Sequence, residues 1–169
     1  TVAEICPSDT LVVVRFPANG RWREALAQAH AEDSEWARSA LRGLAAEYRA
    51  KSADHLLHLS AGEREALREA GVVATLLPGT SLVLGKPYAD GRALVEAGVP
   101  VAVASDCNPG SCALENLAMV LALACYGCKL SPAEAIVATT HNAAASLGLA
   151  AELGRLTPGL DADLLVLAT

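Results

Sequence analysis

The chain has 169 residues, of which 53% are hydrophobic, 4% aromatic and 19% charged, and its formal net charge is −6. This apolar content is high enough to offset chain entropy, so an intrinsically disordered chain is excluded. The diffuse acidic balance disfavours a non-specific nucleic-acid binder, since such a protein needs a basic surface. Length alone predicts one domain with a core of its own.

The apolar runs and the cysteines indicate in which cellular compartment the protein is expected. The longest apolar runs, such as 119–126, are far shorter than the ~20 residues that a membrane-spanning helix needs. No basic segment followed by an apolar core opens the chain, so we expect neither a secretory signal nor a membrane partner. The odd number of cysteines favours reduced thiols in a cytoplasmic protein. They are Cys6, Cys107, Cys112, Cys125 and Cys128.

Apolar periodicity and capping residues predict strands that alternate with helices. In chain order, the predicted strands cover 11–16, 52–57, 72–77 and 101–104. The predicted helices cover 22–30, 36–48, 61–70, 90–97, 114–126, a segment that opens at 132, and 140–147. Ser60 as N-cap and Gly71 after the last turn delimit the helix at 61–70. Ser131-Pro132-Ala133-Glu134 combines an N-cap, a proline in first position and a glutamate in third.

The strands are apolar on both faces, which predicts an α/β fold with a parallel sheet between helices. Pro78-Gly79 is predicted to close the strand at 72–77. About three strand–helix units are present, whereas a closed eight-stranded barrel takes about 250 residues, so the chain supplies less than half of one. Segment 154–167 breaks this alternation of strands and helices, because a turn at Pro158-Gly159 is followed by a predicted strand with no helix after it. We expect that strand to belong to another sheet. The chain begins at Thr1, and we expect both of its ends to be cut.

The most distinctive local segment is 104–111, in which small apolar residues end in an acid and a Pro-Gly turn. At the carboxyl end of a parallel strand, Asp106 would point into the site that all the strands share. Asn108, the backbone near Gly110 and the hydroxyl of Ser111 are suited to a polar ligand. The alternative is an Asx-turn in which Asp106 caps the loop. The local pattern leaves both interpretations open.

The histidines and one cysteine pair have structural alternatives. His55 ends a strand, where it is either catalytic or a core histidine. His30, followed by two acids, is by itself typical of a solvated helical face. His58 is predicted at the surface and His141 in the first turn of a helix. Cys125-x-x-Cys128 has the spacing of metal and redox sites but no second pair, so buried free thiols are the better explanation.

Seven short elements from residue 52 onward form a recognisable series. They are 52–56, 76–80, 98–102, 105–111, 138–144, 154–159 and 162–164. In order and spacing these elements resemble the imidazolonepropionases, which are metal-dependent amidohydrolases of histidine breakdown. The last two are general to the amidohydrolase superfamily, whereas Asp-x-Asn-Pro-Gly-Ser and Ser-Ala-Asp-His are more specific to this family.

The resemblance implies a fold for most of the chain. Residues 1–150 would be the C-terminal half of a TIM-type (β/α)8 barrel, with the origin of 1–29 unassigned. Residues 151–169 would begin the return strand of a small accessory β-sheet.

The resemblance also implies roles for five residues at the mouth of the last barrel strands. Asp106 would ligate a metal and accept a proton from the nucleophile. Asn108 and Gly110 would hold the glutamate-like portion of the ring-opened product, and Ser111 would contact the imidazolone. His55 would polarise the substrate or move a proton.

Upstream, His30-Ala31-Glu32-Asp33 resembles the family's His-Ala-Asp-Glu/Gln element. It implies that His30 is a metal ligand and that Asp33 contacts the substrate. The sequence departs from the family at Cys107, where an aromatic residue is usual, and at His141, where an aliphatic residue is usual. The family's His-x-His pair, which supplies two metal ligands, is not found in this sequence.

The implied reaction is the hydrolytic opening of 4-imidazolone-5-propanoate to N-formimidoyl-L-glutamate with a divalent metal, zinc or iron. Because several ligands are missing, we expect the isolated chain to be inactive or very weak. We expect a small-molecule substrate, no nucleic acid and a homodimer of the full-length enzyme. Two alternatives are another amidohydrolase, such as a deaminase or cyclic-amide hydrolase, and a non-catalytic half-barrel that binds a partner through exposed strand edges.

Overall fold

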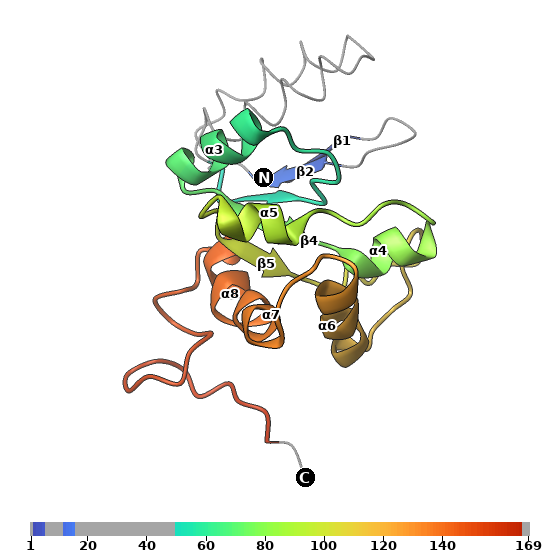
Figure 1. Ribbon diagram of the computed structural model, residues 1–169. Coiled ribbons are helices and arrows are strands. Elements are labelled where there is room, and N and C mark those ends of the chain that lie inside the picture. The colour runs from blue at the N-terminus through green and yellow to red at the C-terminus, as the bar shows by residue number, and fades with distance from the viewer. Residues whose placement is uncertain (1, 6–11, 16–49, 167–169) are drawn as a thin grey trace.

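The computed structural model describes residues 2–5, 12–15 and 50–166. Five strands form one sheet in the order β1-β2-β3-β4-β5 (Figure 1). They are β1 (Val2–Ile5), β2 (Val12–Arg15), β3 (Ser52–Asp54), β4 (Val73–Leu76) and β5 (Val101–Val103). β3, β4 and β5 are parallel, with Ala53 opposite Ala74 and Ala74 opposite Val101. The predicted parallel sheet is thus confirmed for these three strands.

The N-terminal strands correct the prediction of a purely parallel sheet. β1 was not predicted, and it pairs antiparallel with β2, which in turn pairs antiparallel with β3. The connection 6–11 between β1 and β2 is shorter than the dozen or more residues that a parallel crossover requires, so a hairpin-like pairing is the accessible one. The predicted helices at 22–30 and 36–48 lie outside the described residues, as do Cys6, His30 and Asp33.

Six helices belong to the described part of the chain. They are α3 (Ala61–Ala70), α4 (Pro78–Val83), α5 (Gly91–Glu96), α6 (Leu117–Tyr126), α7 (Pro132–Thr139) and α8 (His141–Leu147). In Figure 1, α6, α7 and α8 gather below β5, and α5 lies over the sheet. α7 and α8 both pack against β5.

The predicted helix starts at Ser60 and Ser131 are confirmed in atomic detail. Ser60 Oγ accepts a hydrogen bond from the backbone N–H of Glu63 (3.3 Å), and the Glu63 carboxylate accepts one from the backbone N–H of Ser60 (2.7 Å). The same reciprocal pair joins Ser131 and Glu134, at 3.3 and 2.8 Å. Each capping box satisfies backbone donors that a helix leaves unpaired at its start.

Two helix starts differ from the prediction. Pro78-Gly79 does not form a closing turn but begins α4, where proline occupies a position without an N–H to lose. α6 starts at Leu117 rather than at residue 114, because the side chain of Asn116 caps it by accepting from the backbone N–H of Met119 (3.1 Å).

The core lies between the strands and the helices that cover them. Every residue of β4 and β5 is buried, as expected for parallel strands with helices on both faces. Leu67 of α3, Leu94 of α5 and Val120 of α6 are almost completely buried against them. Burial of each such side chain stabilises the fold by about 1.5–3 kcal/mol.

The segment after α8 leads away from the sheet (Figure 1). The strand predicted for its end is not formed in the described part, since 161–166 carry no regular secondary structure. Leu165 and Val166 are 82% and 84% exposed. A strand needs a neighbouring strand to satisfy its backbone N–H and C=O groups. Among the described residues, none forms such a pairing with segment 161–166. Within residues 2–5, 12–15 and 50–166, no helix combines the length and apolarity that crossing a membrane demands.

Candidate active site at the carboxyl edge of the parallel strands

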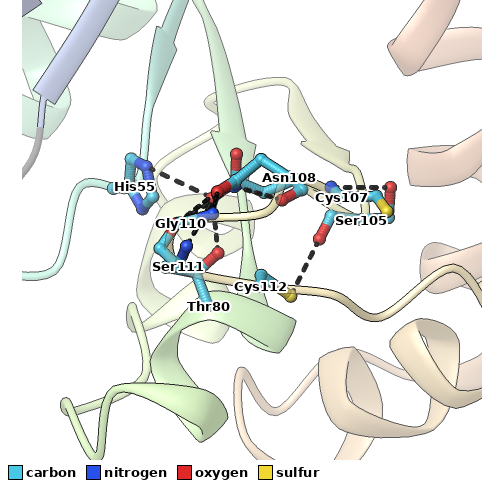
Figure 2. Close-up of polar contacts among 9 residues, drawn as sticks. His55, Thr80, Ser105, Cys107, Asn108, Gly110, Ser111 and Cys112 are labelled. Atoms are coloured by element: carbon cyan, nitrogen blue, oxygen red, sulfur yellow. Dashed lines mark hydrogen bonds and ion pairs between the residues drawn. The ribbon is translucent and has the colours of Figure 1, made fainter.

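Three polar side chains meet just beyond the ends of three neighbouring strands. His55 directly follows β3, Thr80 lies in α4 immediately after β4, and Asp106 follows β5. Because the three strands are parallel, their carboxyl ends share one edge of the sheet. Figure 2 shows His55 at the end of its strand and Thr80 on its helix, both near the loop that carries Asn108, Gly110 and Ser111.

The carboxylate of Asp106 is the centre of the cluster. Thr80 Oγ1 donates a hydrogen bond to Asp106 Oδ2. His55 Nε2 lies 4.0 Å from the same oxygen. The His55 side chain is only 4% exposed, while that of Asp106 is 25% exposed. A buried imidazole therefore lies beside a carboxylate that solvent or a ligand can reach. Both groups belong to types that act as general acids or bases towards a bound substrate.

Both residues of this pair have left-handed backbone conformations. The φ angles are 67° at His55, 51° at Leu56 and 52° at Asp106. Such angles are uncommon for residues with a side chain and cost on the order of 1–3 kcal/mol each. The Asp106 carbonyl accepts a hydrogen bond from Asn108 Nδ2 at 2.6 Å, and the His55 N–H donates to the Thr75 carbonyl at 2.9 Å. These contacts hold the strained backbone in place.

Asn108 organises the loop from within. Its Oδ1 accepts from the backbone N–H groups of Gly110 (2.9 Å) and Ser111 (2.8 Å). Its Nδ2 donates to Ser111 Oγ (3.0 Å) as well as to the Asp106 carbonyl. The backbone N–H of Asn108 donates to the carbonyl of Cys112 (2.8 Å) and closes the loop. An Asx-turn is thus present, but Asn108 forms it, and the Asp106 side chain instead faces Thr80 and His55.

Thr80 is the residue of this cluster that sequence reasoning missed. Segment 76–80 is one of the seven elements that resemble the imidazolonepropionases, but the resemblance implies no role for Thr80. Thr80 is 4% exposed. A Cβ added at Gly79 would lie 3.0 Å from Cys112 Sγ and 3.4 Å from the Ser105 carbonyl. Gly79 therefore lets the start of α4 approach the loop after β5 closely, and Thr80 then reaches Asp106. This glycine is the feature of the sequence that could have indicated the close approach.

The remaining predicted positions lie away from the cluster or beside it. His58 is exposed, as predicted, and His141 is the first residue of α8. Cys107 is exposed and Cys128 is buried, and both are free thiols. Burial raises the pKa of the Cys128 thiol to about 12. A thiol with this pKa stays protonated at neutral pH. The prediction of buried free thiols at Cys125 and Cys128 is therefore met in full at Cys128, whereas Cys125 is free but only partly buried.

The described residues supply part of a metal-binding set. Carboxylate oxygen and imidazole nitrogen are common ligands of zinc and iron, and Asp106 and His55 bring one of each to the same place. Within the described part of the chain, no three His, Cys, Asp or Glu side chains gather closely enough to hold a metal ion. A catalytic zinc takes three protein ligands. Asp106 therefore fits a metal as one ligand of a larger set.

A neighbouring cleft of about 460 Å³ is lined by residues of 56–60, the start of α3, and Asp90 and Leu94. Glu63, Arg64 and Asp90 contribute the charged groups of its wall. The loop 106–111 does not line it. This cleft is therefore separate from the Asp106 cluster, although Leu56 on its wall directly follows His55 in the chain.

The sequence profile of the amidohydrolase family matches residues 21–169, and the chain belongs to this family. Among curated relatives, it is similar to the imidazolonepropionases. It is 49% identical to that of Parabacteroides distasonis over 124 residues, which is 73% of this chain and 30% of the relative. It is also 49% identical to that of Geobacillus kaustophilus over 123 residues, or 73% and 29%. The chain spans about 30% of the length of the curated relatives it matches.

Solved structures support the same fold. An adenosine deaminase from Xanthomonas campestris with bound zinc superposes with a TM-score of 0.63 and 22% identity, over 83% of this chain and 34% of that one. The guanine deaminase of E. coli gives a TM-score of 0.58 and 27% identity, over 64% and 26%. An atrazine chlorohydrolase from Arthrobacter aurescens complexed with zinc gives 0.54 and 26%, over 64% and 26%. The α/β architecture is therefore that of amidohydrolases.

Proposed function

We propose that the chain carries the C-terminal half of the catalytic barrel of an imidazolonepropionase-like hydrolase. In this proposal, residues 1–150 are barrel and 151–169 begin the accessory sheet. The observation that carries it is the meeting of His55, Thr80 and Asp106 at the carboxyl edge of three parallel strands. Enzymes with this kind of barrel have their active sites at that edge. The 49% identity to imidazolonepropionases supports the choice of reaction.

The proposed reaction is hydrolysis of the cyclic amide of 4-imidazolone-5-propanoate. Water adds across the amide C–N bond, so the hydroxyl joins the carbonyl carbon, a proton joins the nitrogen, and N-formimidoyl-L-glutamate results. Asp106 accepts the proton of the attacking water. His55, buried beside it, stabilises charge on the carbonyl oxygen or delivers a proton to the leaving nitrogen.

Substrate binding is assigned to the loop after β5. Asn108 and Gly110 bind the glutamate-like portion and Ser111 contacts the ring, with Asp33 as a further contact. Asn108 does this while its amide holds the loop together, so its removal would disturb both loop and binding. Gly110 is exposed and Ser111 half-buried, which leaves both open to a ligand.

A divalent metal, zinc or iron, is part of the proposal, with Asp106 and His30 among its ligands. When bound, such an ion supplies electrostatic stabilisation of developing negative charge and makes water acidic enough to ionise near neutral pH. Zinc in the related atrazine chlorohydrolase supports a divalent ion. Carboxylate and imidazole suit both zinc and iron.

We further propose a cytoplasmic enzyme that acts as a homodimer. The free thiols at Cys107, Cys112, Cys125 and Cys128 support a reducing compartment.

The test replaces the matching segment of the Geobacillus kaustophilus imidazolonepropionase by this chain and follows N-formimidoyl-L-glutamate formation. The chimaera should turn over, and Asp106→Asn should lower kcat by about 100-fold or more, since a positioned acid or base contributes that much. Asp161→Asn is the matched control, because Asp161 is exposed and distant in sequence from the cluster.

Full activity of the Asp106→Asn chimaera would contradict the proposal. Hydrolysis of guanine or adenosine without that of the imidazolone would point to a deaminase instead. A folded chimaera without activity on any of these substrates would favour a non-catalytic half-barrel.

A further inference from the structure

The position of Thr80 is held by contacts that do not involve Asp106. It lies in the first turn of α4, where Pro78, Gly79 and Ser81 are also buried. Its carbonyl accepts a hydrogen bond from the Leu84 N–H at 3.0 Å. Threonine is β-branched, so its hydroxyl has few orientations to choose from. The hydroxyl therefore presents a donor in a defined direction.

Among the described residues, two side chains approach the Asp106 carboxylate, namely those of Thr80 and His55. Its backbone is held by Asn108 through the carbonyl, and the loop is closed by the hydrogen bond between Asn108 and Cys112. Neither contact acts on the carboxylate. Thr80 Oγ1 donates to Oδ2, and a hydrogen bond to an ionised carboxylate is stronger than one between neutral groups. His55 Nε2, at 4.0 Å, is beyond hydrogen-bond distance of that oxygen.

We propose that Thr80 is a positioning residue, which holds the Asp106 carboxylate in one orientation so that it can take a metal and a proton. This inference rests on the proposed function, since Thr80 acts only through Asp106. The hydrogen bond joins α4 to the loop after β5, so it couples the ends of two neighbouring strands. Groups that orient a metal ligand in this way affect metal affinity or activity by about 10–100-fold.

The first test uses the complete 169-residue chain and needs neither metal nor substrate. The variant Thr80→Val keeps the shape of the side chain and removes the hydroxyl, whereas Thr80→Ser keeps the hydroxyl. Three-bond couplings between Hα and Hβ in NMR report χ1 of Asp106. We expect one rotamer in the unchanged chain and in Thr80→Ser, and rotamer-averaged couplings in Thr80→Val.

The chain offers a matched control in Thr75→Val. Thr75 is a buried threonine of β4, and its Oγ1 has no hydrogen-bond partner among the described residues. This variant removes the same group without touching Asp106, so the Asp106 couplings should stay those of the unchanged chain. Averaged couplings in Thr75→Val as well would show a general loosening of the sheet and overturn the inference.

Identical Asp106 couplings in Thr80→Val and the unchanged chain would also overturn it, as would averaged couplings in the unchanged chain itself. If Thr80→Val does not fold, Thr80→Ala replaces it with the same expected result.

The second test measures the consequence in the active chimaera. Thr80→Val should lower kcat by about 10-fold or more with little change in KM, and Thr80→Ser should restore kcat. Equal kcat in Thr80→Val and its parent would overturn the catalytic part of the inference. An inactive chimaera together with the expected NMR result would instead refute the proposed function and leave the positioning of Asp106 established.

Discussion

His55 and Asp106 combine backbone strain with a side-chain contact. Left-handed conformations at residues other than glycine persist where the surrounding structure enforces them, and they cluster at active sites. Here the enforcing contacts are hydrogen bonds to the strand end at Thr75 and to the amide of Asn108. The strain therefore supports a functional assignment for the pair, beyond their proximity.

The cysteines allow a direct test of burial at the residue scale. Cys107 is exposed, whereas Cys128 is buried and burial raises its pKa to about 12. Because only the thiolate is alkylated, iodoacetamide should modify Cys107 rapidly and Cys128 very slowly at mildly alkaline pH. Peptide mass spectrometry over time measures both rates.

Cys107→Ser serves as the control for this comparison, since it should remove the modified Cys107 peptide and leave the alkylation rate of the Cys128 peptide unchanged. In denaturant the two rates should become similar. Equal rates in the folded chain would refute the burial of Cys128.

At the scale of secondary-structure elements, one ion pair joins two helices that cover the sheet. Arg92 of α5 contacts Glu134 of α7 at 2.7 Å. The hydrogen bond from Arg92, followed by those from Ser131, lowers the pKa of Glu134 from 4.5 to about 2. A carboxylate with a depressed pKa stabilises the folded state when it is ionised. The pair therefore adds stability above pH 4.5, and this stability is lost as the pH falls towards 2.

Glu134→Gln should lower the free energy of unfolding at neutral pH, since it removes the charge that Arg92 and Ser131 recognise. The difference from the unchanged chain should shrink as the pH falls through 4.5 towards 2. Urea unfolding across this range measures it. The exposed Glu152→Gln is the control with the same chemistry, and a pH-independent difference for Glu134→Gln would contradict the assignment.

Helix limits were predictable where a local motif specifies them. The capping boxes at Ser60 and Ser131 and the stop at Gly71 use contacts within a few residues, so the sequence contains all of their partners. Pro78-Gly79 was misread because the same dipeptide suits a turn and the first turn of a helix. Burial of α4 against the loop after β5 decided between them.

At the scale of the whole molecule, the described sheet has three parallel and two antiparallel strands. A closed barrel of this family's kind takes eight parallel strands. The chain spans about 30% of the length of the imidazolonepropionases it matches. The described residues bring one carboxylate and one imidazole together where a catalytic metal takes three protein ligands.

We therefore expect the isolated 169-residue chain to hydrolyse 4-imidazolone-5-propanoate very slowly or not at all, even with added zinc. Product formation measured beside the Geobacillus kaustophilus enzyme checks this expectation. Rates near those of that enzyme would contradict it and would show that residues of this chain outside the described part complete the site.

Local features could be predicted from the amino-acid sequence, namely the apolar strands β4 and β5, the capped starts of α3 and α7, and the motifs that resemble those of amidohydrolases. Three features became apparent only in the folded chain. They are the antiparallel pairing of β1 and β2, the hydrogen bond from the Asn108 amide to the Asp106 carbonyl, and the contact of Thr80 with Asp106. The two groups of features differ in how far apart the interacting residues lie along the chain. A cap or an apolar alternation is complete within one turn or strand, whereas Thr80 and Asp106 are 26 residues apart and meet only because parallel strands end at one edge of the sheet.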